Sequence, residues 1–389
     1  MTIVSVLLTM LFPIIMLPIN IALFSTDKKH GTLYAFLIAF AMAALAFNFR
    51  PYSYQNTDIL RHFNSMKAAK LLTFSEAADT NTFSGLSGYF LLLKLFSYAE
   101  NQYLLPAFVT LIGYFLCIFV INKIDIKESN GISFLTVYLF MSCISFLGFC
   151  SGIRQYLTFA IFVFVFYLET VKKKFRLGAW IVYFLLLTLH TSAGFLIILR
   201  VIAGFFSGFR HTKVLAVCIL LWSFTQKSIV GFLERNFSGS SIVEKIVEYS
   251  GYYKENGSEF IPYAYIWCFA LLVFCTGVVI YLIKNFNKED GIPEKYLYLA
   301  ISACMFTFGG FTSYDIFSRF SIFCFMLILP MFPLFFKKLL PGTRSIYFGG
   351  LLLFSTLVLI YNINQYATFH FESILKILFT NIVTFMGAI

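Results

Sequence analysis

Charged residues are scarce in this chain of 389 residues, at 12%, whereas about 25% is usual in a soluble domain. Hydrophobic residues make up 60% of the chain and include 51 Phe, which is more than a water-soluble fold of this length can bury. The composition therefore excludes a nucleic-acid-binding protein, a cytosolic enzyme and a disordered scaffold. In this setting the net charge of +11 is a signal of membrane topology, not of an acidic partner.

Several motifs are also missing. The eight cysteines form no CxxC or Cys/His spacing, so we expect small core residues and neither a zinc site nor a disulfide framework. There is no internal repeat, no low-complexity tract and no motif for a metal or another cofactor. No Lys or Arg precedes the first apolar run, which argues against a cleaved signal peptide and makes residues 2–24 the first predicted span.

What the chain does have is a succession of apolar runs of roughly 20 residues, the length that crosses a bilayer as a helix. The runs are continuous and do not alternate, which excludes a transmembrane β-barrel. We predict an all-α polytopic membrane protein, residues 1–389 forming a single integral membrane domain with about twelve transmembrane helices. The predicted spans are 2–24, 31–49, 102–122, 131–150, 152–170, 177–190, 191–207, 213–231, 261–283, 296–314, 318–336 and 345–365.

Lys and Arg residues concentrate in short loops between these spans. The loops are 25–30, 123–130, 171–176, 208–213, 284–295 and 337–344. Dense positive charge in short loops marks the cytoplasmic side. The N-terminus and the two long loops, 50–101 and 232–260, are therefore predicted to be extracytoplasmic.

The segment 177–206 would make a single helix of about 45 Å, well beyond the ~30 Å hydrocarbon core. Because basic clusters flank both of its ends, we predict a hairpin of two short helices with its tip at residues 189–194. Three further helical pieces are expected outside the spans. They are a re-entrant or interfacial helix at 84–98, an amphipathic surface helix at 242–248, and an interfacial segment at 371–389.

Ionisable residues within or beside spans are the candidate functional residues, because lipid makes them costly. Those on the predicted outer side are Arg154 with Gln155, His190, Asp315, Arg319 and, in the first outer loop, Asp58, Arg61 and His62. Structural explanations remain open for each. Asp315 and Arg319, four residues apart, could pair on one helix face. Arg154 could extend to lipid phosphates, and His190 could be a satisfied core histidine.

Arginines at an outer membrane surface suit a diphosphate, because guanidinium binds phosphate oxygens through paired hydrogen bonds. Arg154 and Arg319 would hold the diphosphate and stabilise its charge as it leaves. His190 is the first candidate for the general base or hydroxyl-orienting group, while Asp315 would position Arg319 or act as the base instead. The candidates for substrate binding are Asp58, Arg61, Gln155, Tyr249 and Tyr252. The tyrosines would stack on sugars, with an interfacial aromatic belt as the alternative.

The order of these residues resembles the EpsG-like branch of the Wzy-type polysaccharide polymerases. In that family an Arg-Gln begins a span, as at Arg154, and a Phe/Leu-His-x-Ser follows about 35 residues on, as at His190. An Arg-Phe/Leu appears late in the chain, as at Arg319. The stretch from Asp58 to His62 resembles the family's Asp-x-x-x-Tyr, with His in place of the aromatic residue. The Glu that often precedes the helix near residue 84 is missing. The resemblance spans roughly residues 50–330.

The resemblance implies an enzyme of the bacterial inner membrane with its active site facing the periplasm. Such polymerases join undecaprenyl-diphosphate-linked oligosaccharide repeat units into O-antigen or capsular polysaccharide, without a cofactor. The partners it implies are this lipid-linked oligosaccharide, membrane lipid and a chain-length-regulating co-polymerase, with no nucleic acid. The alternatives are an O-antigen ligase acting on the same donor, a transporter or flippase of lipid-linked oligosaccharide, and a non-enzymatic membrane scaffold.

Overall fold

The computed structural model describes most of the chain. The described residues are 2–51, 58–80, 82–83, 85–124, 130–144, 146–205, 221, 228, 231–232, 235–236, 261–311, 314–366, 369–371 and 374–388. They divide into two compact units. Unit 1 comprises Met1–Ile197 and Leu329–Ile389, and unit 2 comprises Ile198–Ile328.

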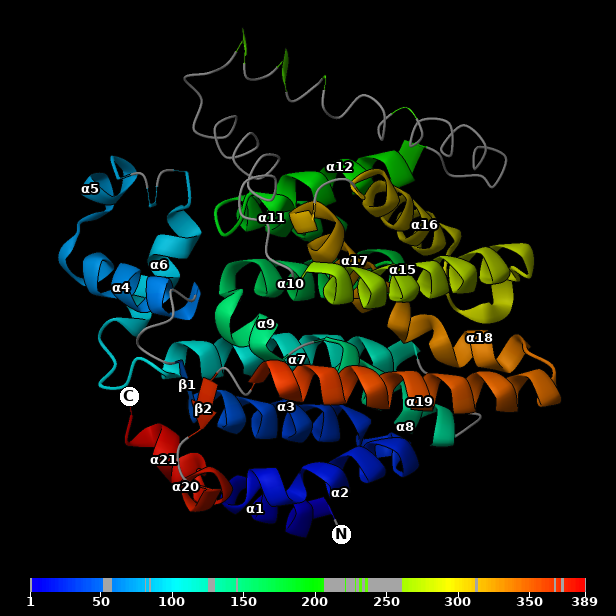
Figure 1. Cartoon of the computed structure of the whole chain (residues 1–389), viewed down its shortest axis with the longest axis horizontal. Helices are drawn as coiled ribbons and strands as arrows, with labels where there is room; N and C mark the ends of the chain where they lie inside the picture. The colour runs from blue at the N-terminus through cyan, green and yellow to red at the C-terminus, as the bar shows by residue number, and fades with distance from the viewer. Residues whose placement is uncertain are drawn as a thin grey trace. The chain divides into compact units, whose positions relative to one another are not determined.

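Helices make up nearly all of the regular structure in unit 1 (Figure 1). Its first half contains α1 (Thr2–Leu11), α2 (Pro13–Thr26), η1 (Lys28–His30), α3 (Gly31–Phe47), β1 (Phe49–Pro51), α4 (Asp58–Leu71), α5 (Phe74–Ala78), α6 (Ser87–Phe96) and α7 (Leu104–Ile124). Its second half contains α8 (Asn130–Cys143), α9 (Phe146–Ser151), α10 (Ile153–Thr170), α11 (Arg176–Leu187), the start of α12 (Ser192–Phe205), η4 (Leu329–Met331), α18 (Phe332–Lys338), α19 (Pro341–Tyr366), β2 (Phe369–Phe371), α20 (Ile374–Phe379) and α21 (Ile382–Met386).

Six helices of the described residues are long and apolar enough to cross a membrane. They cover Lys28–Phe47, Leu104–Ile124, Ile153–Thr170, Tyr265–Lys284, Ile316–Lys338 and Pro341–Asn362, and each overlaps a predicted span. Shorter apolar helices, including α2, α8, α11 and α12, coincide with others. The protein is thus a helical multi-pass membrane protein, while the number of twelve spans stays a prediction. The predicted span 213–231 lies almost entirely outside the described residues, as does the predicted helix at 242–248.

The first predicted span, 2–24, is wrong as a single helix: α1 ends at Leu11 and α2 begins at Pro13. A proline lacks the amide hydrogen that the helix needs, and its ring clashes with the carbonyl four residues earlier. Buried polar side chains hold the two helices together. Asn20 donates to the Thr9 hydroxyl at 2.9 Å and accepts from the Ser5 hydroxyl at 3.0 Å, which satisfies polar groups that would be costly in an apolar interior.

Helices α3 and α7 form the antiparallel centre of unit 1. At one end Asn122 donates to the Thr32 hydroxyl at 3.3 Å, and at the other the Arg50 guanidinium lies 3.6 Å from the centre of the Tyr103 ring. Helix α3 contributes fully buried alanines at Ala35, Ala39 and Ala43, which are at most 2% exposed. Small residues let two backbones approach closely, the usual basis of helix association in membranes.

The other long helices of unit 1 run alongside this centre (Figure 1). The ring of Phe119, late in α7, contacts the rings of Phe164 and Tyr167, late in α10, so α7 and α10 are parallel. Helix α8 returns in the opposite direction and pairs with α19, where Asn362 donates to the Ser142 carbonyl at 2.7 Å. The predicted span 131–150 is not one continuous helix, since α8 ends at Cys143 and α9 begins at Phe146.

The segment 177–206 is broken as predicted. Helix α11 ends at Leu187 and α12 begins at Ser192, so each helix is only about 20 Å long. The Tyr183 hydroxyl of α11 donates to the buried Glu169 carboxylate, late in α10, at 2.9 Å. The doubling back of α12 along α11 stays a prediction, because α12 passes from unit 1 into unit 2 at residue 198.

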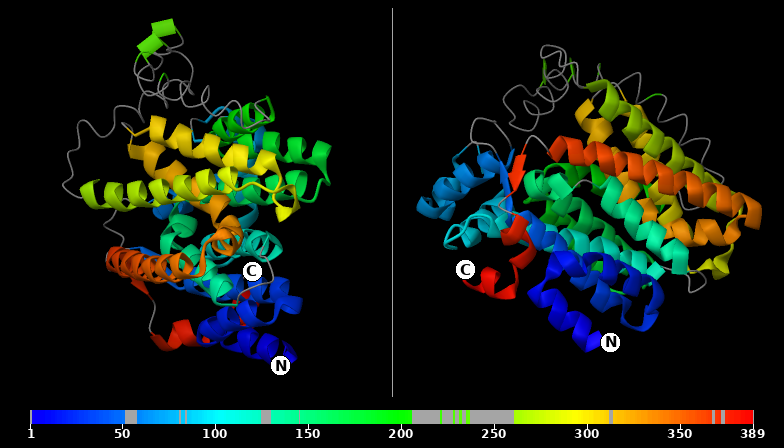
Figure 2. Two further views of the ribbon diagram at one scale, coloured as in Figure 1. Left: turned by 90° about the vertical axis from the view of Figure 1, so that its right-hand side faces the viewer. Right: turned by 60° about the horizontal axis from the view of Figure 1, so that its bottom comes forward.

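Two short strands modify the all-α prediction. Residues Phe49–Pro51 pair antiparallel with Phe369–Phe371, with Arg50 opposite His370. The C-terminal helices then pack against the N-terminal ones (Figure 2). The Phe385 ring contacts Phe40 and Phe47. The C-terminal segment predicted at the interface thus ties the end of the chain to the beginning of unit 1.

Unit 2 contains α15 (Ile261–Lys284), η3 (Lys288–Asp290), α16 (Glu294–Gly309) and α17 (Tyr314–Ile328). The three α-helices pack on one another. The Tyr265 hydroxyl donates to the Phe311 carbonyl at 2.9 Å, and the buried Tyr296 hydroxyl donates to the Leu327 carbonyl at 3.0 Å. Cysteines behave as the composition predicts, since the seven in the described residues are all buried.

Candidate functional site

The candidate site lies at the end of unit 1 where helices α4 and α6 meet the start of α10. Helix α4 begins at Asp58, an acidic residue of the kind that favours a helix N-terminus. Its apolar face consists of Ile59, Phe63 and Met66, all at most 5% exposed. This spacing buries one stripe of the helix. His62 falls beside that stripe and is therefore buried too, at 6% exposed.

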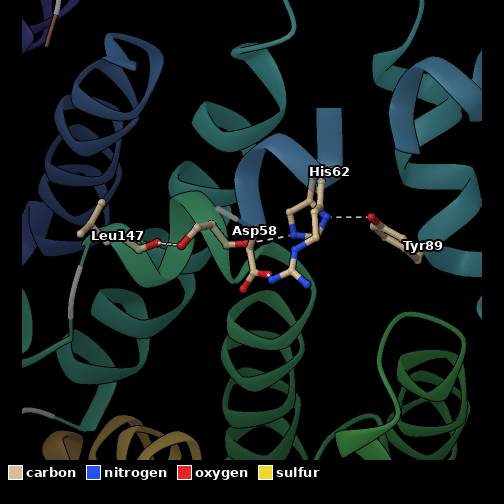
Figure 3. A network of polar contacts seen from close by, with 6 residues as sticks. Asp58, His62, Tyr89 and Leu147 are labelled. Atoms are coloured by element: carbon tan, nitrogen blue, oxygen red, sulfur yellow. Dashed lines mark hydrogen bonds and ion pairs between the residues drawn. The ribbon is translucent and has the colours of Figure 1, made fainter. Parts of the chain in front are cut away.

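Both ring nitrogens of His62 are engaged (Figure 3). Nε2 lies 2.9 Å from the Ser151 carbonyl oxygen, and Nδ1 lies 2.7 Å from the Tyr89 hydroxyl. A carbonyl only accepts, so Nε2 carries the proton, and in the neutral ring Nδ1 accepts from Tyr89. Burial, followed by the positive charge of Arg154, lowers the pKa of His62 from 6.5 to about 4. His62 is thus a neutral histidine that connects α4, α6 and α9.

The carbonyl that His62 binds belongs to the turn that begins α10. Ser151 is the last residue of α9, its hydroxyl donates to the Leu147 carbonyl at 2.7 Å, and Gly152 caps α10. The backbone here passes very close to the Tyr156 ring. A Cβ added at Gly148 would lie 2.2 Å from a carbon of that ring, so glycine is required for this turn to close.

Arg154 stands in the first turn of α10, half-buried, with its guanidinium carbon 4.6 Å from the centre of the Tyr89 ring. Its guanidinium makes no hydrogen bond or ion pair with any residue of the described ranges. Arg50 differs, since its guanidinium donates to the Phe47 carbonyl at 2.6 Å and to the Phe49 carbonyl at 3.2 Å. The donors of Arg154 are therefore available to a ligand, next to a helix N-terminus that also favours anions.

Helix α6 brings the break between α11 and α12 to the same place. The Tyr89 amide donates to the Thr188 carbonyl at 3.1 Å. A Cβ added at Gly88 would lie 2.4 Å from the Thr188 hydroxyl oxygen, so the two backbones touch at a glycine. The start of α10, helices α4 and α6, and the break between α11 and α12 therefore meet at one end of unit 1.

His190 lies within this break, half-buried. Its Nδ1 accepts from the Ser192 amide at 3.0 Å and lies 2.8 Å from the Ser192 hydroxyl oxygen. A backbone amide can only donate, so the lone pair of Nδ1 is occupied and the neutral ring carries its proton on Nε2. With its lone pair occupied, Nδ1 is not placed to accept a further proton, and the predicted role of His190 stays a prediction.

The remaining candidate residues are placed as follows. Asp58 and Arg61 are exposed and form an ion pair with each other. Gln155 is 7% exposed, and its side-chain amide makes no hydrogen bond to a described residue. Arg319 is half-buried in α17 of unit 2, one turn after Asp315, whose side chain lies outside the described residues. Tyr249 and Tyr252 also lie outside them.

Sequence reasoning missed Tyr89 and gave His62 no role. Tyr89 lies in an apolar helix with nothing nearby in the sequence to mark it. Its place in the candidate site is visible only from its contacts with His62 and Arg154. The sequence placed His62 among the candidate residues and at the aromatic position of the family motif, but its hydrogen-bond partners gave no signal there.

The opposite end of unit 1 collects the basic loops and is chemically different. There Lys28 donates to the Ser133 hydroxyl, and Lys123 lies near the Phe119 ring. At the same end Asp27 accepts from His30 at 2.8 Å, an interaction that lowers the pKa of the Asp27 carboxyl. Throughout the described ranges, no three His, Cys, Asp or Glu side chains are grouped to hold a metal ion.

A multi-pass membrane protein with an arginine available to an anion at one end is the class that these helices and this site define. No curated protein and no solved structure matches the chain significantly. The EpsG family model matches residues 60–375, most of the chain. The chain therefore belongs to the EpsG family, as its motifs indicate, and is a membrane protein related to polysaccharide synthesis.

Proposed function

We propose that the protein is a membrane glycosyltransferase that polymerises undecaprenyl-diphosphate-linked repeat units into O-antigen or capsular polysaccharide at the periplasmic face. The observation that carries the proposal is Arg154. Its guanidinium is half-buried, lies against Tyr89 and has no polar partner in the described residues. It stands at a helix N-terminus, at the end of unit 1 away from the basic loops. Family membership supports the polysaccharide substrate.

In the proposed reaction, a hydroxyl at the non-reducing end of a new unit attacks the anomeric carbon of the growing chain. The bond between that carbon and the diphosphate oxygen breaks, its electron pair leaves with undecaprenyl diphosphate, and a glycosidic bond forms. The hydroxyl proton passes to a base. Arg154, together with Arg319, would bind the diphosphate and stabilise the negative charge that develops on it.

The other residues take supporting roles. His190 would orient the attacking hydroxyl, with its ring held in place by the Ser192 amide at Nδ1. Asp315 is then the first candidate for the base, or positions Arg319. Asp58, Arg61 and Gln155 would contact the oligosaccharide. Chain length would be controlled by a separate co-polymerase.

The test uses the full-length protein, purified in detergent and supplied with undecaprenyl-diphosphate-linked repeat units. We expect a ladder of chains on a gel and release of undecaprenyl diphosphate. Arg154→Ala should abolish the ladder. The matched control Arg176→Ala removes an exposed arginine at the basic end and should leave the ladder unchanged.

Two alternatives give different results in the same assay. A ligase would transfer single units to an added lipid A-core acceptor and would build no ladder without it. A flippase or transporter would give no new glycosidic bond in detergent, where there are no compartments. A normal ladder from Arg154→Ala would remove this arginine from the site.

A further inference from the structure

We infer that His62 is a positioning residue, which holds the guanidinium of Arg154 where it can receive an anion by fixing both Tyr89 and the start of α10. The inference rests on the proposed role of Arg154 in binding a diphosphate. The inference gives a role to His62, which stands where the family motif has an aromatic residue. In this role His62 does not contact the substrate. Since Nδ1 and Nε2 are both engaged within the protein, His62 acts only through its neighbours.

The first connection runs through Tyr89. The hydroxyl of this tyrosine donates to Nδ1 of His62 at 2.7 Å, and its backbone amide donates to the Thr188 carbonyl at 3.1 Å. The side chain is thus held at its far end as well as at its base. The ring between these two points faces the guanidinium of Arg154 at 4.6 Å, a distance within which a cation is attracted to a ring face.

The second connection runs through the backbone. Nε2 of His62 donates to the Ser151 carbonyl at 2.9 Å, three residues before Arg154. Ser151 ends α9, and Gly152 allows the turn into α10. A hydrogen bond at this turn fixes the direction in which α10 starts. The same histidine therefore sets the position of the backbone that carries Arg154 and of the ring on which its side chain lies.

This arrangement requires a neutral His62. The charged or titratable groups that face it are Asp58 and Arg61 on α4, Tyr89 on α6 and Arg154 on α10. Helix α9 carries no charged side chain, and its one titratable group, the buried Cys150 thiol, lies against the Thr110 hydroxyl. A proton on Nδ1 would remove the acceptor for the Tyr89 hydroxyl and place a second cation close to Arg154. The anion site should therefore weaken when His62 is protonated.

Three variants separate positioning from folding. His62→Gln keeps a donor for the Ser151 carbonyl and an acceptor for the Tyr89 hydroxyl, His62→Leu keeps neither, and Tyr89→Phe keeps the ring but loses the hydroxyl. The matched control is His30→Leu, which removes a histidine at the basic end. The probe is inorganic pyrophosphate, measured both by direct binding and as an inhibitor of polymerisation by the full-length protein in nanodiscs.

We expect His62→Leu and Tyr89→Phe each to weaken pyrophosphate binding about tenfold, the effect of losing one aligned cationic contact. The double variant should be no worse than either, because both act through one connection. His62→Gln should bind within about threefold of wild type and lose the weakening of binding at acid pH that wild type shows. His30→Leu should match wild type.

The outcomes distinguish this inference from the proposed function. If Arg154→Ala binds pyrophosphate as wild type does, the anion site itself is misassigned. If Arg154→Ala loses binding while folded His62→Leu retains it, the anion site stands and the role of His62 is refuted. Equal impairment of His62→Gln and His62→Leu, with both variants folded by gel filtration, would also refute it.

Discussion

Acid should destabilise this protein through one histidine. In the folded protein the pKa of His62 is about 4, whereas its ordinary value is 6.5. Between these two pKa values His62 is protonated in the unfolded chain but neutral in the folded protein. Lowering the pH through this range therefore favours unfolding. Above about pH 6.5 both states are neutral, and His62 contributes no pH dependence.

The size of the effect follows from the two pKa values. The difference between 6.5 and about 4, at about 1.4 kcal/mol for each tenfold change in proton affinity, amounts to about 3 kcal/mol once the pH is below both. Most of this should already appear at about pH 5, where the loss from His62 is about 2 kcal/mol. A loss of this size is a large part of the stability of an ordinary domain.

The assay compares the unfolding of wild type and His62→Gln in mixed micelles at about pH 7 and about pH 5. Glutamine does not titrate, so the wild type should lose about 2 kcal/mol more than the variant over this interval. His30→Gln, at the opposite end of unit 1, should keep the wild-type dependence. Equal losses in wild type and His62→Gln would show that His62 is accessible to protons in the folded state, and would refute the buried, neutral assignment.

Three further predictions concern packing and charge. Gly88→Ala would place a methyl group 2.4 Å from the Thr188 hydroxyl oxygen and 3.3 Å from the backbone of that residue, so α6 should shift and chain-ladder synthesis should fall. Gly113→Ala would place a methyl group 2.0 Å from an aromatic carbon of α9 and should lower stability by about 1–3 kcal/mol, seen as a lower melting temperature. As a control, Gly277→Ala adds a methyl group where there is open space, so it should lower neither chain-ladder synthesis nor the melting temperature. Arg154→Lys keeps the charge but loses the paired geometry, so the Michaelis constant for the lipid-linked unit should rise, and an unchanged constant would contradict a bidentate contact.

The helices of this protein could be predicted well from the sequence. In lipid every backbone polar group must be bonded within the chain, so each apolar run has to be a helix. The break after Leu187 was predictable because the run is too long and is flanked by basic residues. The interruptions at Pro13 and near residue 145 were not predicted, because hydropathy does not report where backbone bonding changes.

The candidate site was predictable only in part. Arg154 and His190 were identified from the sequence, since an ionisable residue is costly in an apolar segment. The hydrogen-bonding states of their side chains could not be predicted in the same way. Whether a histidine donates or accepts depends on which group lies against each nitrogen, and for His190 that group is the Ser192 amide. For His62 it is a carbonyl 89 positions along the chain.

The sequence by itself determined that this is a helical membrane protein of the EpsG family, and it predicted that the polar residues gather away from the basic loops. Hydrophobic run length and charge placement carry that information locally, residue by residue. Only the tertiary structure decided that Tyr89 contacts both His62 and Arg154, and that the guanidinium of Arg154 makes no hydrogen bond within the part of the chain that is described. Such contacts join α4, α6 and α10 across long stretches of chain, and they depend on how the helices pack, which no local pattern encodes.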